Sequence, residues 1–458
     1  MLAPSIQSCI EQKKPVHLIG IGGISMNSLA ELLMSQGVPV TGSDRAQSAI
    51  TDRLEGLGAK ITYAHLAENV EGAALVIRTA AVHDDNPEVM RAQELGIPVI
   101  ERAQAWGQLM VDYETVICLA GTHGKTTTTS MMTLIAMQAA LDPTVMVGSN
   151  LPAIGGTLRI GGKGTFVAES CEYCNSFLSF APTIAVILNV EADHLDFFKD
   201  LDDVIHSFHD FCTLVPENGL LVVNADDPAA LRSVEGVARP VVSFGLSEQA
   251  DVRAVHIAVQ NGYYAFDVVA GESCYGHMEL SVPGKHNLMN ALACCAVARF
   301  LGIPGEVTAA GLHAFTGSSR RFQRLGKTAA GALVVDDYAH HPSEMVATLR
   351  TAREMNFDRI ICAFQPHTYT RTKALFDDFA DALKLCDLAV LAPIYAAREQ
   401  NTVGISSADL AAQVPGARCL DTFAEIAAFL EKEATAGDLV ITMGAGDIFR
   451  VGEQLVQK

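Results

Sequence analysis

The sequence predicts an α/β protein of three domains, each built on a largely parallel sheet. Short apolar runs rich in Val, Ile and Leu alternate with longer helical patterns along the whole chain, as in proteins with parallel sheets. Strand-to-loop-to-helix patterns restart near residues 20, 121 and 336. At 458 residues the chain can form several cores of ordinary size. We expect domains over residues 1–113, 114–322 and 323–458.

The expected strands are the apolar runs that end in polar or glycine-rich loops. They comprise residues 16–19, 75–77, 116–120, 166–168, 184–190, 220–223, 334–337, 360–364, 388–392 and 439–443.

The composition argues against two classes of protein. The net charge is −20, whereas a nonspecific nucleic-acid binder needs clustered Lys and Arg. No apolar run approaches the roughly 18 residues of a membrane span, and the first 15 residues show no apolar signal core. The 11 cysteines lie scattered in apolar stretches, which is typical of reduced thiols in the cytosol. We expect a cytoplasmic protein that neither binds nucleic acid nor inserts into a membrane.

A glycine-rich turn follows the first expected strand. Gly20, Gly22 and Gly23, with Ser25 at the third glycine position, join this strand to a helix, and Asp44 ends the next strand. The spacing is typical of a Rossmann-like domain, in which an acidic residue about 20 positions on contacts a ribose. Taken alone, the motif fits a NAD-dependent dehydrogenase or a protein that binds another nucleotide diphosphate.

The strongest motif is a Gly-Thr-His-Gly-Lys-Thr-Thr run between an apolar strand and a helical pattern. Backbone N–H groups at such a junction hold phosphates at the positive end of the helix. Lys125 can reach the β- and γ-phosphates, and the Thr126 hydroxyl can ligate Mg²⁺. Leu119 stands where the usual phosphate loop has its first glycine, so this is a shorter variant. We expect a central P-loop ATPase domain whose ATP-binding loop comprises Gly121, Thr122, His123, Gly124, Lys125, Thr126 and Thr127.

Two further segments offer metal ligands. Glu169 follows one apolar strand, and Asp193, His194 and Asp196 follow another. At the carboxyl edge of a sheet these groups can complete a Mg²⁺ shell and hold a second ion. The alternatives are a helix cap for Glu169 and a surface histidine for His194. The Cys171-x-x-Cys174 pair has no second such pair, which a structural zinc site needs.

Polar residues also gather in the last third of the chain. Asn287, at a helix start, could contact a purine or ribose, or simply cap the helix. Arg321 could stabilise a transferring phosphoryl group. Alternatively, Arg320 and Arg321 could simply be two neighbouring solvated charges. Two loops follow strands where parallel sheets place ligand loops; their polar residues include Asp336, Tyr338, His340 and Arg371.

Taken in chain order, these motifs resemble those of the Mur ligase family over essentially the whole chain. The resemblance rests on the N-terminal glycine turn, the phosphate loop, the His-Asn-x-x-Asn segment, the Arg-Phe pair, Asp-Asp-Tyr-x-His-His-Pro and Gln-Pro-His-x-Tyr-Thr-Arg-Thr. It implies a Rossmann-like N-terminal domain, the central ATPase domain and a Rossmann-like C-terminal domain.

The resemblance implies three groups of contacts. The UDP-sugar site would comprise Gly20, Gly22, Gly23, Ser25, Asp44, Thr79 and Asn86. The central site would hold ATP through its loop, with Asn287 near adenine, Arg321 near the phosphates and Asp336 near the ribose, and Mg²⁺, as two ions, through Thr126, Glu169 and His194. The amino-acid site would comprise Tyr338, His340 and Arg371.

The implied reaction is ATP-dependent ligation in bacterial peptidoglycan synthesis. The lactyl carboxylate of UDP-N-acetylmuramate would form an acyl phosphate, which the amine of L-alanine then displaces. Lys125, His194, Arg321 and His340 are the expected catalytic residues, with His340 the candidate base. Thr368 stands where family members often have Arg, which leaves glycine or serine open in place of L-alanine. A peptide-recycling ligase that accepts a tripeptide is the nearest alternative. We expect a monomer or a weak homodimer.

Overall fold

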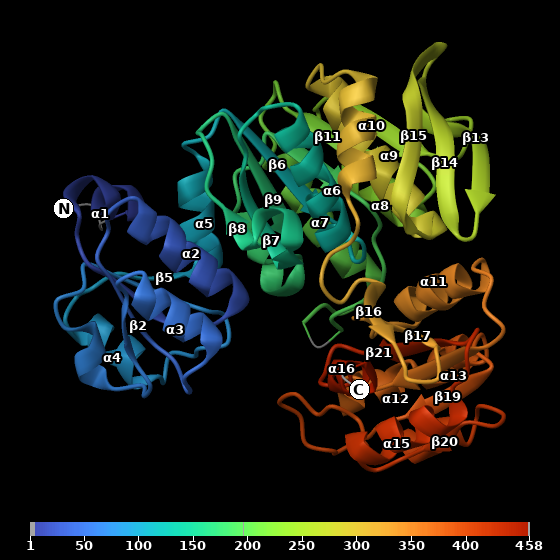
Figure 1. The fold of residues 1–458 in the computed structure, drawn as a ribbon. Coiled ribbons are helices and arrows are strands. Elements are labelled where there is room, and N and C mark those ends of the chain that lie inside the picture. Colours follow the sequence, from blue (N-terminus) through green and yellow to red (C-terminus); the bar gives the residue numbers. More distant parts are fainter. Residues whose placement is uncertain (1–4, 196, 457–458) are drawn as a thin grey trace. The chain divides into compact units, whose positions relative to one another are not determined.

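The structure is a computed structural model that describes residues 5–195 and 197–456. It contains two compact units. The first comprises Met1–Ala254, Val268–Gly276 and Asn290–Gly311, and the second comprises Val255–Asp267, His277–Met289 and Leu312–Lys458. Figure 1 shows the helices and strands of both and labels most of them.

The N-terminal sheet is parallel throughout and has the strand order β3-β2-β1-β4-β5. Its strands are β1 (Val16–Ile19), β2 (Val40–Ser43), β3 (Lys60–Thr62), β4 (Leu75–Arg78) and β5 (Val99–Glu101). The helices around it are α1 (Ile6–Gln12), α2 (Ile24–Ser35), α3 (Ala49–Gly56), η1 (Ala67–Val70), α4 (Pro87–Glu94) and α5 (Arg102–Met110). This strand order confirms the predicted Rossmann-like architecture.

Helices cover both faces of this sheet because successive strand residues point to opposite sides. Leu18 and Ile77 pack in one cluster with residues of α2 and α5. Ile19 and Val76 pack in another with residues of η1 and α4. Apolar side chains therefore cover both faces of the N-terminal sheet, as the uninterrupted apolar runs of its strands predict.

The central sheet has ten strands in the order β15-β14-β13-β12-β11-β10-β6-β9-β7-β8. Its strands are β6 (Thr115–Ala120), β7 (Thr144–Leu151), β8 (Gly156–Arg159), β9 (Thr165–Ser170), β10 (Ile184–Ile187), β11 (Leu220–Asn224), β12 (Val241–Gly245), β13 (Val252–Gln260), β14 (Tyr263–Ala270) and β15 (Ser273–Pro283). The accompanying helices are α6 (Lys125–Gln138), η2 (Pro152–Ile154), η3 (Tyr173–Ser179), α7 (Leu201–Thr213), α8 (Pro228–Val234), α9 (Lys285–Phe300) and α10 (Gly305–Ala314). Parallel neighbours β9 and β10 flank β6, so the loops after these three strands meet at one edge of the sheet.

The C-terminal sheet has the order β16-β17-β21-β18-β19-β20 and is parallel except for the β16–β17 pair. Its strands are β16 (Gln323–Lys327), β17 (Leu333–Asp337), β18 (Ile360–Phe364), β19 (Leu388–Leu391), β20 (Arg418–Cys419) and β21 (Leu439–Met443). Its helices are α11 (Pro342–Arg353), α12 (Tyr369–Ala374), α13 (Phe376–Leu383), α14 (Ser407–Ala411), α15 (Phe423–Glu433) and α16 (Phe449–Val456). Separate apolar clusters cover its two faces.

Two local predictions have the wrong bounds. The strand expected at residues 184–190 ends at Ile187, because Leu188 N and Asn189 O bond to Ala120 O and Thr122 N of the phosphate-loop segment. The glycine-rich sequence from Gly326 to Gly331 predicts a turn before the strand at residues 334–337, but Gly326 belongs to β16, where it forms a bulge with φ of 153°, and the turn follows at residues 329–330. The domain boundaries at 113/114 and 322/323 remain predictions.

Across the described residues, no helix combines the length and apolar character needed to cross a membrane.

Candidate functional site

The N-terminal glycine turn binds a carboxylate of the chain itself. Gly22 N donates to Asp44 Oδ2 over 2.8 Å, and a Cβ on Gly22 would lie 2.8 Å from the same oxygen. A side chain at residue 22 would therefore displace Asp44. A nucleotide diphosphate at this turn would compete with Asp44 for the Gly22 N–H. Gly20 has φ of 79° and Gly23 precedes α2.

The other predicted UDP-sugar residues have local partners. Ser25 Oγ accepts from Trp106 Nε1 at 3.1 Å. Thr79 Oγ1 accepts from Ala81 N at 3.0 Å, and Asn86 Oδ1 caps α4. These contacts shape the loops, and the role of the three residues in sugar binding stays a prediction.

The phosphate loop lies between β6 and α6, as predicted. Gly121 has φ of 150° and Gly124 has φ of 83°, conformations that favour glycine. Within the described residues no side chain caps α6, although the first N–H groups of a helix need acceptors. The start of α6, with Thr126 and Thr127 in its first turn, is therefore a suitable anion site.

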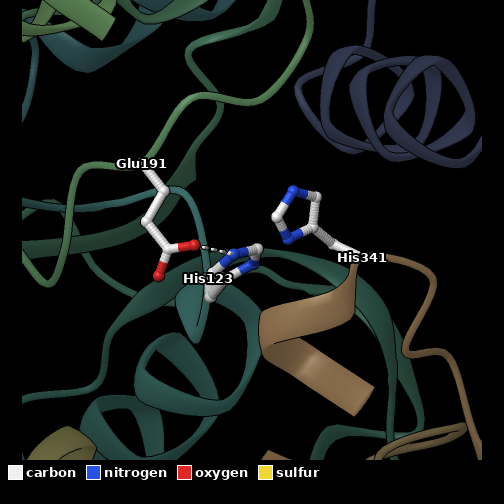
Figure 2. Close-up of side chains that lie close together, drawn as sticks. All are labelled: His123, Glu191 and His341. Carbon is white, nitrogen blue, oxygen red and sulfur yellow. Dashed lines mark hydrogen bonds and ion pairs between the residues drawn. The ribbon is translucent and has the colours of Figure 1, made fainter. Parts of the chain in front are cut away.

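Asn189 holds this loop in shape, a role that the sequence analysis missed. Asn189 Oδ1 accepts from His123 N at 2.7 Å, and Asn189 Nδ2 donates to His123 O at 3.0 Å. Thr122 N donates to Asn189 O at 3.0 Å. His123 Nε2 lies 3.3 Å from Glu191 Oε2, the contact dashed in Figure 2. The loop after β10 thus fixes the loop after β6.

Lys125 is partly buried beside Glu172, a buried carboxylate to which the sequence analysis assigned no role. Its Nζ lies 2.9 Å and 3.2 Å from the two oxygens of Glu172. It also donates to Gly121 O at 2.5 Å and Thr122 O at 2.9 Å. Burial lowers the pKa of the Lys125 ammonium, but the nearby carboxylates, Glu172 foremost, outweigh burial and raise this pKa. Lys125 is therefore a fixed positive charge at the loop.

Thr126 and Glu169 form the best candidate metal site. Thr126 Oγ1 donates to Glu169 Oε1 at 2.9 Å, and Gly148 N donates to Glu169 Oε2 at 2.6 Å. A Cβ on Gly148 would lie only 2.5 Å from Glu169 Oε1, so glycine is needed here. A hydroxyl and a carboxylate at the phosphate loop are the hard oxygen ligands that Mg²⁺ prefers.

His194 lies at the same edge of the first unit. Its Nε2 is 3.9 Å from Glu172 Oε1 and 3.8 Å from Asp193 Oδ2. The Tyr173 ring packs on the imidazole with centroids 4.6 Å apart. Thus the segment after β9 contacts both Lys125 and His194. Asp196 lies outside the described residues.

The two asparagines of α9 have different surroundings. Asn287, in the second unit, donates from Nδ2 to Pro283 O at 2.7 Å, and its adenine contact remains a prediction. Asn290, in the first unit, approaches the phosphate loop: a Cβ on Gly124 would lie 2.7 Å from Asn290 Oδ1.

In the second unit, the structure separates the roles of two adjacent arginines. Arg320 pairs with Asp336 at 3.0 Å and stacks on Tyr338 and Phe449. Arg321 stacks on Tyr338 with its Cζ 5.1 Å from the ring centroid, and it makes no ion pair within 4.0 Å in the described part of the chain. Arg321 is therefore the better cation for an anionic ligand.

The two aspartates of β17 are both buried. Asp336 accepts from Thr442 Oγ1 at 2.7 Å as well as from Arg320, so a ribose hydroxyl would have to share this carboxylate. Burial raises the pKa of Asp337 to about 6, while Arg321 and the Ala339 and Phe322 N–H groups limit the rise.

The predicted amino-acid residues lie near one another in the second unit. The Tyr338 and His340 rings have centroids 5.3 Å apart, and those of His340 and His367 lie 5.7 Å apart. Arg371 NH1 is 3.4 Å from His367 Nδ1. The sequence analysis missed His367, although it lies in the quoted Gln-Pro-His motif.

Thr368, beside this group, has a strained backbone. Its φ of 63° and ψ of 146° are unusual for a β-branched residue. Thr368 N donates to Tyr395 O at 2.9 Å, which helps to hold the strained conformation.

Comparison with known families identifies the class of protein. The Mur ligase family catalytic domain matches residues 15–114, the Mur ligase middle domain residues 119–298 and the Mur ligase glutamate ligase domain residues 320–446. The chain belongs to the Mur ligase family.

Two curated relatives and one solved structure that resemble the chain carry the same enzyme name. UDP-N-acetylmuramate–L-alanine ligase of Caldanaerobacter subterraneus subsp. tengcongensis is 46% identical over 454 residues, 98% of each chain. The ligase of that name from Acetivibrio thermocellus is 48% identical over 450 residues, 97% of this chain and 96% of that protein. A crystal structure of UDP-N-acetylmuramate-alanine ligase from Thermotoga maritima has a TM-score of 0.81 and 28% identity, covering 96% of this chain and 98% of that one.

Proposed function

We propose that this chain joins L-alanine to the lactyl carboxylate of UDP-N-acetylmuramate, converting ATP to ADP and phosphate. The reaction would supply a precursor of peptidoglycan in the bacterial cytoplasm. The observation that carries this proposal is a phosphate loop with a fixed lysine charge in a chain that matches ligases of this name over nearly its full length.

The two steps of the reaction place different demands on the chain. A lactyl carboxylate oxygen attacks the γ-phosphorus of ATP. The bond between this phosphorus and the oxygen that links it to ADP breaks, which yields an acyl phosphate and free ADP. The amine of L-alanine then attacks the acyl carbon, and phosphate leaves with that carboxylate oxygen. Lys125 and the N–H groups of α6 would stabilise negative charge on the phosphoryl oxygens.

Mg²⁺ fits the ligands near the loop. Thr126 and Glu169 would hold one ion, and His194 would contribute to a second. When bound, Mg²⁺ neutralises phosphate charge and aligns the phosphates for attack. Thr126 Oγ1 and Glu169 Oε1 lie 2.9 Å apart, close enough for one ion to contact both oxygens.

Residues of the second unit would make ligand contacts of their own. Arg321 would contact phosphate, Asp336 the ribose and Asn287 the adenine. Arg371 would pair with the carboxylate of L-alanine, beside Tyr338 and His340. His340 Nδ1 lies 3.0 Å from Tyr338 O and 3.3 Å from Glu344 Oε2, two acceptors that suit an N–H group at that nitrogen.

Phosphate release tests the proposal and its nearest alternatives. The assay contains ATP, Mg²⁺, UDP-N-acetylmuramate and one of L-alanine, glycine, L-serine or the wall tripeptide, and mass spectrometry checks each product. We expect release with L-alanine to exceed that with glycine or L-serine by at least about 10-fold, since even one methyl group in a fitted pocket is worth about 1–3 kcal/mol.

Each other outcome has a definite meaning. Release that needs the tripeptide would replace the proposal with the recycling ligase. A preference for glycine or L-serine would retain the ligase chemistry and change the amino acid. An absence of release with every acceptor would contradict the ligase function.

A further inference from the structure

Glu172 is a buried carboxylate to which the proposed reaction assigns no role. It is 1% exposed and precedes η3. Its two oxygens both contact Lys125 Nζ, at 2.9 Å and 3.2 Å. Its main chain is fixed by Asn175 N, which donates to Glu172 O at 2.8 Å. The main chain that carries the carboxylate is therefore held in place beside the phosphate loop.

The Lys125 ammonium has no N–H group left for a ligand in this structure. An ammonium carries three N–H donors, and four oxygens lie within 3.2 Å of Nζ: Gly121 O, Thr122 O and the two of Glu172. A nucleotide phosphate can contact Lys125 only by replacing one of these acceptors. The two carbonyl groups are main-chain groups of the phosphate loop, which Asn189 holds in place, so Glu172, an anionic side chain from another segment, is the acceptor that a phosphate would replace.

Charge makes this exchange a direct competition. Glu172 and a nucleotide phosphate are both anionic and both need the same ammonium. Charges interact strongly at short range in a buried site, so the ion pair with Glu172 opposes phosphate binding. The same ion pair keeps the Lys125 ammonium at the loop when no nucleotide is bound.

Glu172 has a second partner when Lys125 moves. His194 Nε2 lies 3.9 Å from Glu172 Oε1, and the neighbouring Tyr173 packs on the His194 ring. The carboxylate would therefore stay beside a polar side chain rather than be left alone in an apolar interior, where an unpaired charge is costly.

We propose that Glu172 is a positioning residue that holds Lys125 in the nucleotide-free protein and releases it to the nucleotide phosphates, remaining beside His194. This inference rests on the proposed nucleotide-binding function. It assigns Glu172 an effect on nucleotide affinity, which distinguishes it from a carboxylate that only stabilises the fold.

Calorimetric titration with ADP tests the inference. Binding is measured in EDTA, where no metal bridges phosphate and protein, for the wild type, Glu172→Gln and Glu172→Asp. We expect Glu172→Gln to bind ADP about 10-fold more tightly, equivalent to about 1.4 kcal/mol, because the competing charge is gone. Glu172→Asp keeps the charge and should not bind more tightly than the wild type.

A second pair of variants shows whether the effect passes through Lys125. In a Lys125→Met background, Glu172→Gln should change ADP affinity by less than about 3-fold, because there is no ammonium to release. This double variant also removes the unpaired charge that could destabilise Glu172→Gln. Glu217→Gln, at an exposed position before β11, is the matched control and should bind as the wild type does.

Two results would overturn the inference: unchanged or weaker ADP binding by Glu172→Gln, or an equal gain in the Lys125→Met background. A parallel titration with Mg²⁺ and ADP tests the proposed function separately. If the wild type does not bind the nucleotide even with Mg²⁺, the proposed function fails and this inference fails with it.

Discussion

Lys125→Ala should lower kcat for ligation by about 10³-fold or more. Lys125 is the first residue of α6, and the loss of one preorganised donor to a developing oxyanion costs about 10²–10³-fold. Loss of a full charge at a transferring phosphoryl group should cost at least as much. Phosphate release with UDP-N-acetylmuramate and L-alanine, at saturating ATP, measures the effect.

The control must separate catalysis from folding. Lys125→Ala leaves the Glu172 charge with the more distant His194, 3.9 Å away, as its polar neighbour, and removing one partner of a buried ion pair destabilises a protein by up to about 3–5 kcal/mol. The double variant Lys125→Ala/Glu172→Gln removes that charge, so it should recover thermal stability without recovering activity. Lys199→Ala, at an 86% exposed side chain, should behave as the wild type. A Lys125→Ala enzyme with more than about a tenth of wild-type kcat would contradict the role of Lys125.

Glu169→Gln should raise the Mg²⁺ concentration required for activity and lower kcat/KM by about 10²-fold at millimolar Mg²⁺. The amide keeps the shape of the side chain and can still accept from Gly148 N, so the fold should persist. It lacks the charge that a hard cation needs from its ligand. The Mg²⁺ dependence of phosphate release measures the change, and high Mg²⁺ should restore part of the activity.

A matched glutamate shows whether the effect is local. Glu94 is 64% exposed and pairs with Arg91 on α4, so Glu94→Gln removes one charge without touching the phosphate loop. Its Mg²⁺ curve should overlay that of the wild type. If the Glu169→Gln curve also overlays it, Glu169 is not a metal ligand.

The sequence was most informative where local chemistry decides the structure. The apolar run at residues 16–19 forms β1 with the predicted bounds, and the phosphate loop lies at the predicted strand-to-helix junction. Strand patterns and glycine turns are local signals, so they can be read without knowledge of tertiary contacts. The three-domain α/β fold follows from their order.

Side-chain pairing could not be predicted in the same way. Glu172 and Lys125 are 47 residues apart, and Glu172 precedes η3, whose backbone is left-handed at Cys174 and Asn175. Likewise, nothing in the pair Arg320-Arg321 reveals that Arg320 is held by Asp336 while Arg321 is not. Tertiary packing determines which side chains pair with one another, and a single sequence does not reveal that packing.

The most direct test of the proposed chemistry is transfer of ¹⁸O from the lactyl carboxylate of UDP-N-acetylmuramate to phosphate. The labelled substrate is incubated with ATP, Mg²⁺ and L-alanine, and the released phosphate is examined by mass spectrometry. An acyl phosphate intermediate requires one carboxylate oxygen to leave with phosphorus, so we predict one ¹⁸O atom in each phosphate formed from doubly labelled carboxylate. Phosphate without ¹⁸O would mean that water attacks ATP directly, and it would contradict the ligase mechanism.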